Sequence, residues 1–218
     1  MSDGKSGRRG FIAGSLGGIL AFVPAASLLA RDSAASEVDE SWLRGLTGKH
    51  RQFFDVGSIQ AGAPLRRVHN FLATYASAYG VQESNVNAVF GAHGQGLGFV
   101  LGDVAWVKYD LGTQYNSSDP VTARPSTRNL FAMMSTKLGN VPPEASVANL
   151  QKRGVRFLAC NNSLNGLAEQ LAAKTQTDVA SVRSDLLAAL LPGVTVVPAM
   201  LIAGNRAQEA GLTYAALG

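Results

Sequence analysis

The sequence contains only one cysteine, Cys160, among its 218 residues. A single cysteine excludes an internal disulfide framework, so a chain of this length must be stabilised by a hydrophobic core. Histidine is also scarce, with three residues at positions 50, 69 and 93. Their wide spacing, and their distance from Cys160, lack the pattern of zinc ligands. The sequence therefore predicts no metal site, and we expect no cofactor.

Long runs of charge are missing too. Charged residues make up 16% of the chain, and residues 36–218 contain 15 basic and 13 acidic residues, a net charge of +2. No basic run alternates with aromatic residues, so nucleic acid is not an expected partner. The chain contains neither a Gly-x-Ser-x-Gly motif nor a P-loop lysine, which argues against a serine hydrolase with a nucleophile elbow and against a P-loop nucleotide-binding protein.

The N-terminal segment differs in composition from the rest of the chain. Arg8 and Arg9 precede Gly10 and Phe11, and an uncharged, glycine-rich run then extends to Ala30. This pattern is typical of a twin-arginine export signal, which predicts a signal peptide over residues 1–35, a linker over 36–50 and export to a bacterial periplasm by the twin-arginine translocase. The alternative is an uncleaved membrane anchor. The glycines and Pro24 within the run disfavour a permanent membrane helix.

Beyond residue 50 the pattern of apolar residues alternates between strands and helices. It predicts strands at 51–59, 85–93, 155–160 and 194–199, and it predicts helices between and after them. Such alternation is typical of a mostly parallel sheet in a three-layer α/β/α sandwich, formed here by a single domain over residues 51–218. Residues 111–149 lack this regularity and are expected to form a loop insertion that acts as a lid or an oligomer contact.

Two reactive side chains are expected at the carboxyl ends of predicted strands, Cys160 and His93. Ligands of parallel α/β sheets bind at that edge. Asn162 or Ser163 is expected to cap the following helix, which would place the Cys160 sulfur beside free N–H groups that favour a thiolate. His93 is a candidate base or hydrogen-bond partner for that thiol. The alternative is that Cys160 is core packing, as buried free cysteines often are, and that His93 only orders a turn.

A glycine-rich segment, GAHGQGLGF, follows the second predicted strand. Its glycines do not have the spacing of a dinucleotide-binding motif. Gly94 and Gly96 are instead expected to let the backbone approach a small anion or another subunit.

Four segments resemble the DsrE/DsrF-like (YchN-like) family over residues 51–217. They are FGAHGQGLGFVL, GVRFLACNNSL, LLPGVTVVPAM and AQEAGLTYAAL. The resemblance implies a flavodoxin-like domain that forms homo-oligomers, often trimers or hexamers. Some members of the family carry sulfur as a persulfide on a cysteine that is similar in position to Cys160.

The resemblance therefore implies an exported sulfur carrier or sulfur-transfer protein with Cys160 and His93 at its centre and a sulfur donor or acceptor protein as partner. The surrounding candidates for ligand binding are Gly94, Gly96, Asn161, Asn162 and Ser163. The alternative function is a non-catalytic oligomeric module for small-ligand binding or assembly, in which Cys160 is core packing.

Overall fold

A computed structural model describes residues 38–218, which form one compact unit. The predicted export signal at 1–35, including Arg8, Arg9 and Phe11, lies outside the described residues. None of the helices within 38–218 is long and apolar enough to span a membrane.

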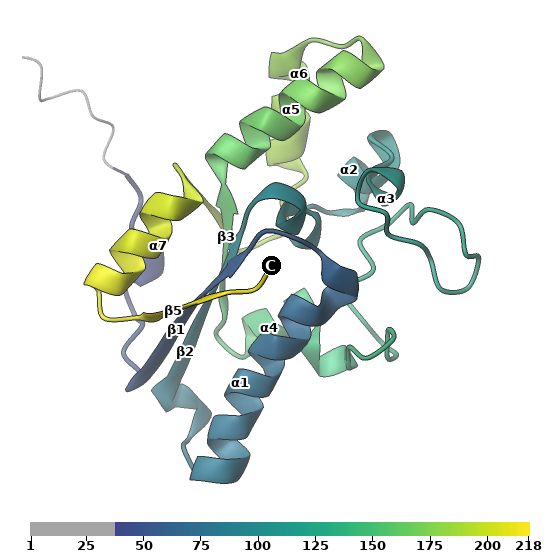
Figure 1. Cartoon of the computed structure of the whole chain (residues 1–218). Helices are drawn as coiled ribbons and strands as arrows, with labels where there is room; N and C mark the ends of the chain where they lie inside the picture. Colours follow the sequence, from purple (N-terminus) through teal and green to yellow (C-terminus); the bar gives the residue numbers. More distant parts are fainter. Residues whose placement is uncertain (1–37) are drawn as a thin grey trace, which may run out of the picture. The chain divides into compact units, whose positions relative to one another are not determined.

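Five parallel strands form the central sheet, in the spatial order β4-β3-β2-β1-β5 (Figure 1). Helices cover both of its faces, which confirms the three-layer, flavodoxin-like α/β/α sandwich. The predicted mostly parallel sheet is fully parallel, and its strand order differs from the 2-1-3-4-5 order of flavodoxin itself. The strands are β1 (His50–Val56), β2 (Val86–Ala92), β3 (Arg156–Cys160), β4 (Val194–Val197) and β5 (Thr213–Ala216).

The strand order distributes the helices unequally between the two faces. Each step from β1 to β4 moves in one direction across the sheet, and right-handed crossovers then place every connecting helix on the same face. The step from β4 to β5 returns across the sheet, so its helix covers the other face (Figure 1). The first face carries α1 (Ala63–Tyr79), α2 (Asp103–Lys108), α3 (Leu111–Gln114), α4 (Val147–Lys152), α5 (Asn161–Thr175) and α6 (Val179–Ala188), and the second carries α7 (Met200–Glu209).

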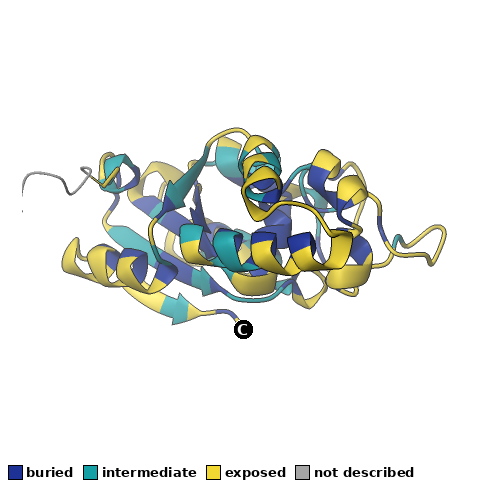
Figure 2. Cartoon of the chain, turned by 90° about the horizontal axis from the view of Figure 1, so that it is seen from above, coloured by how far each residue is buried: buried dark blue, intermediate teal, exposed yellow. Residues whose placement is uncertain are grey.

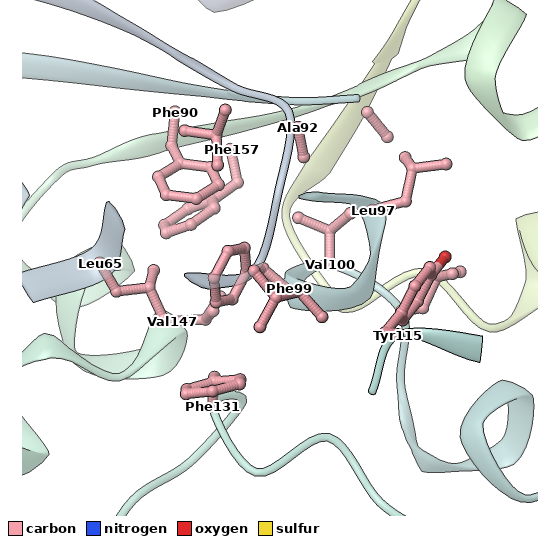
Figure 3. Packing of buried hydrophobic residues seen from close by; sticks show 14 of the residues in the cluster. Leu65, Phe90, Ala92, Leu97, Phe99, Val100, Tyr115, Phe131, Val147 and Phe157 are labelled. Carbon is pink, nitrogen blue, oxygen red and sulfur yellow. The ribbon is translucent and has the colours of Figure 1, made fainter. Parts of the chain in front are cut away.

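Two hydrophobic clusters follow from this arrangement. The larger core lies under α1 to α6 and includes the packed rings of Phe90, Phe99 and Phe157 (Figure 3). The smaller core lies under α7 and includes Phe53 and Cys160. Figure 2 shows the buried residues concentrated between the layers. The alternation of side chains along each strand assigns successive residues to opposite cores.

The prediction that residues 36–50 form a linker is wrong for residues 38–50, the part that the structure describes. Residues 41–43 form a short 3₁₀ helix, and Trp42 and Leu46 are buried in the smaller core. The Trp42 ring lies 6.4 Å from the Phe53 ring on β1. Residues 41–46 therefore help α7 to cover the smaller core on the second face of the sheet.

The final strand of the sheet was not predicted. The sequence pattern indicated that residues 194–199 form the last buried strand, but β4 is a partly exposed edge strand and β5 follows it on the opposite edge. β5 is a short, mostly exposed strand, so its residues lack the apolar pattern by which a buried strand is recognised.

The segment 111–149 is folded onto the domain. It begins with α3 and buries Tyr115, Phe131 and Val141 in the larger core. Asn129 fixes its position, because the side-chain amide donates to the carbonyl oxygens of Phe99 and Leu101 at 2.9 and 2.8 Å. The insertion is therefore a wall of the domain.

Candidate functional site

The helices that follow β3 and β4 leave toward opposite faces of the sheet. α5 follows β3 onto the larger core and α7 follows β4 onto the smaller one. In parallel α/β sheets this divergence opens a crevice at the carboxyl ends of the two strands, where ligands bind. Cys160 ends β3 and pairs with Val197 at the end of β4. The sequence-predicted cysteine thus lies at the topological switch point.

The Cys160 sulfur is close to the amino ends of both helices. Cys160 itself is the N-cap residue of α5, so the expectation that Asn162 or Ser163 caps this helix is wrong. The Sγ atom accepts a hydrogen bond from the backbone N–H of Met200, the first residue of α7, at 3.3 Å. Helix amino ends favour negative charge. The side chain is only 4% exposed, so solvent reaches the sulfur through a narrow opening at most.

His93 lies beside Cys160 at the same edge of the sheet. β2 and β3 pair through Ala92 and Ala159, and His93 continues β2 with extended backbone angles. The next pair in this register is therefore His93 and Cys160. The His93 Nε2 atom lies 2.9 Å from Asp55 Oδ1 on β1, although the ring is not aligned for a linear hydrogen bond.

Asp55 and Tyr214 extend the polar cluster beyond His93. The Tyr214 hydroxyl on β5 donates to Asp55 Oδ2. Burial raises the pKa of Asp55, but the contacts with His93 and Tyr214 outweigh it and hold that pKa below its ordinary value. The hydrogen bond to Asp55, together with burial, raises the pKa of Tyr214 to about 12. Asp55 is therefore an anion and Tyr214 a neutral hydroxyl at neutral pH.

Sequence reasoning missed Asp55 and Tyr214. Asp55 had a detectable signal, because it is an acidic residue within the apolar strand HRQFFDV. Tyr214 had none, since β5 itself was not recognised. From β3 toward β5 the order is Cys160 at the end of β3, His93 directly after β2, Asp55 near the end of β1 and Tyr214 within β5.

The lowered pKa of Asp55 predicts a pH dependence of stability. A carboxyl group whose pKa is depressed by folding stabilises the folded state above its unfolded pKa of about 3.9, and this contribution is lost as the pH falls through the folded value. We expect Asp55→Asn to lower the Tm at pH 5. This difference from the wild type should shrink as the pH falls below about 4.

The measurement is the Tm of both proteins between pH 5 and pH 2. Glu169→Gln, at an exposed position of α5, is the matched control and should leave the Tm nearly unchanged throughout. A difference in Tm between Asp55→Asn and the wild type that stays constant down to pH 2 would contradict the lowered pKa of Asp55.

The other predicted ligand residues have roles in local structure or lie on the surface. The Gly94 N–H donates to Ser163 Oγ at 3.1 Å, which joins the turn after β2 to the first turn of α5. Gly96 is buried, and a Cβ atom there would lie 2.2 Å from the Val56 carbonyl oxygen, so it serves packing against β1. Asn161 Oδ1 accepts from Arg183 at 2.5 Å. Asn162 is exposed.

The remaining histidines are outside the site. His50 stacks on Tyr75 with ring centroids 4.3 Å apart, and His69 contacts Arg153. Within residues 38–218, no group of three or more His, Cys, Asp or Glu side chains is placed to hold a metal ion.

Comparison with known proteins assigns no activity to this chain. No family model matches the sequence, and no curated protein matches it. Among solved structures, the chain is similar to a protein of unknown function, MTH1491 from Methanobacterium thermoautotrophicum. The two are 18% identical with a TM-score of 0.41, and the match covers 77% of this chain and 99% of the other.

Proposed function

We propose that this chain is an exported sulfur carrier that holds a persulfide on Cys160. The observation that supports it is the position of the sulfur: it lies at the switch point, accepts the Met200 N–H and neighbours the His93–Asp55–Tyr214 cluster. A donor at a helix amino end stabilises an anionic sulfur. An anion is the form in which both a thiol and a persulfide react.

The chemistry needs a donor that already contains sulfur at the oxidation level of a disulfide, such as inorganic polysulfide. His93 accepts the thiol proton, and Asp55 stabilises the imidazolium that forms. The thiolate then attacks a polysulfide sulfur, so one S–S bond forms and one breaks. The shortened polysulfide leaves with the electron pair, and no further oxidant is consumed. Transfer to an acceptor thiolate reverses these steps.

Mass spectrometry of the intact protein after incubation with polysulfide tests this function. We expect the mass of one sulfur atom to be added to the wild type, to be removed by reductant and to be absent from Cys160→Ser. Sulfide alone should give no adduct, because it lacks the oxidised sulfur. His93→Gln should form the adduct at least about tenfold more slowly, since it cannot accept the proton.

The 4% exposure of Cys160 favours a second candidate, the non-catalytic oligomeric module in which the thiol is core packing. A thiol of this kind would resist polysulfide and alkylating agents until the protein is unfolded. That result would overturn the carrier function. Alkylation of the folded protein without a polysulfide adduct would also overturn it, because the thiol would then be accessible but unsuited to the transfer.

Export and assembly form part of the same proposal. The Arg8–Arg9 pattern supports passage through the twin-arginine translocase to the periplasm, and the family resemblance supports a homo-oligomer such as a trimer or hexamer. Fractionation of cells that produce the full chain tests the first expectation, with Arg8→Lys and Arg9→Lys combined as the variant that should remain unexported. Light scattering of the purified protein tests the second.

A further inference from the structure

A cleft of about 670 Å³ lies on the larger-core side of the carboxyl edge. Its walls are the loop 59–61 after β1, Gln95 after β2 and parts of the 111–149 segment. A second hollow, of about 340 Å³, continues it toward α5 and shares Gln95, Gln114 and Tyr115 with it. Clefts of this size are typical of small-molecule sites.

Side chains in the walls of the cleft are closely packed. Phe131 packs so closely on Gly62 that a Cβ atom at Gly62 would lie 2.5 Å from the ring. Gln60 and Ala61 both have left-handed backbone angles, with φ values of 41° and 48°. Such angles cost non-glycine residues of order 1–3 kcal/mol each and concentrate at functional sites. This strained turn forms one side of the cleft mouth.

Tyr115 lines the cleft, but its hydroxyl oxygen has almost no accessible surface. Its side chain is 7% exposed, and its hydroxyl is buried without a hydrogen-bond partner among the described residues. Burial raises its pKa well above the usual value, so the hydroxyl remains neutral and can both donate and accept. Figure 3 shows the ring at the border of the larger core, in the same group of side chains as Phe131. A buried hydroxyl without a partner destabilises a protein by about 1–3 kcal/mol.

The lining defines the chemistry of a ligand. The described residues that line the cleft and its continuation include no Lys, Arg, His, Asp or Glu. Ile59, Leu130 and Phe131 provide an apolar surface. The polar positions carry amides and hydroxyls, which donate and accept at once: Gln60, Gln95, Gln114, Asn116, Ser117 and Ser118. A charged ligand would be desolvated here without an opposite charge.

We propose that this cleft binds an uncharged small molecule that carries hydroxyl or amide groups and one apolar face, with the side-chain amides of Gln95 and Gln114 as hydrogen-bond partners. The site is independent of Cys160. Tyr115 and Phe131 belong to the larger core, whereas the Cys160 side chain belongs to the smaller core on the other face of the sheet.

Amide NMR spectra of the ¹⁵N-labelled protein, titrated with N-acetylglucosamine, test this proposal. This probe is uncharged and contains hydroxyls, an amide and an apolar ring face. We expect shifts that cluster at Gln60, Gln95, Gln114 and Tyr115. N-acetylglucosamine 6-phosphate, which adds charge to the same molecule, should bind at least about tenfold more weakly, because its phosphate finds no cation in the cleft.

Two variants connect the binding to the cleft. Gln114→Ala should weaken binding about three- to tenfold, the loss expected for one hydrogen bond. Gln95→Ala should also weaken binding, whereas Gln208→Ala, an exposed glutamine on α7, should not. Absence of binding by N-acetylglucosamine, equal binding of the phosphorylated probe, or unchanged affinity in both Gln114→Ala and Gln95→Ala would overturn the proposal. Because Cys160→Ser should bind the probe normally, failure of the carrier function leaves this test unaffected.

Discussion

Replacing Gly96 with alanine is expected to destabilise the protein by about 3 kcal/mol or more. The new Cβ atom would lie 2.2 Å from the Val56 carbonyl oxygen. That oxygen accepts the His93 N–H at 3.0 Å, and β1 is held between β2 and β5, so the backbone cannot retreat without disturbing the sheet. A loss of this size is a large part of the 5–15 kcal/mol that stabilises a typical domain. Urea unfolding monitored by circular dichroism measures this loss in the free energy of unfolding.

Gly166→Ala is the matched control for this prediction. Gly166 lies within α5, and open space surrounds the position of its missing Cβ atom. Alanine is the better helix former by about 0.5–1 kcal/mol, so this variant should be more stable than the wild type. If both alanine variants were equally stable, the close approach of Gly96 to β1 would be refuted, and a role for Gly96 in ligand binding would regain support.

Asn129→Ala is expected to have a similarly large effect, about 3–4 kcal/mol. The Asn129 amide donates to Phe99 O and Leu101 O, and its Oδ1 accepts the Phe131 N–H at 3.0 Å. Removing the side chain leaves the buried Phe99 carbonyl and Phe131 N–H without this partner, whereas the Leu101 carbonyl keeps the Trp106 indole N–H at 3.1 Å. Because Asn129 anchors the 111–149 segment, hydrogen exchange should accelerate there more than in β1 to β3.

Asn205→Ala, at an exposed position on α7, provides the comparison and should change the stability by less than about 0.5 kcal/mol. The anchoring role of Asn129 would be disproved by a variant that unfolds at the wild-type urea concentration. Acceleration of exchange spread evenly over the sheet would show instead that the segment and the sheet unfold as one cooperative unit.

Much of the fold could be predicted from the sequence because its helices and strands have strong local sequence signals. Pro64 in the first turn and Gly80 at the end delimit α1, and Gly80 adopts the left-handed C-cap conformation. The apolar run at 155–160 became β3, which is covered on both faces. β5 was missed because an edge strand of four mostly exposed residues is too short to show an alternating apolar pattern. The 38–49 segment was taken for a linker because two buried side chains, Trp42 and Leu46, make no periodic pattern.

The candidate site was predictable only in part. Cys160 and His93 were identified because each follows an apolar strand, and the carboxyl ends of parallel strands meet at one edge. Asp55 and Tyr214 are 159 positions apart, so no local pattern joins them. Gly96 was interpreted as a ligand-binding glycine because sequence spacing does not distinguish a glycine that faces a ligand from one pressed against a neighbouring strand.

The sequence by itself determined the order of the first four strands and the helices between them, the single free thiol and the positions of Cys160 and His93 at strand ends, since periodicity and capping are local properties of the chain. Only the tertiary structure decided which residues meet. The strand order 4-3-2-1-5 created the switch point at Cys160 and joined Tyr214 to Asp55. The packing of residues 111–149 onto the sheet enclosed the cleft around Tyr115. Contacts of this kind depend on strand order and register, which are set by the burial of the whole chain.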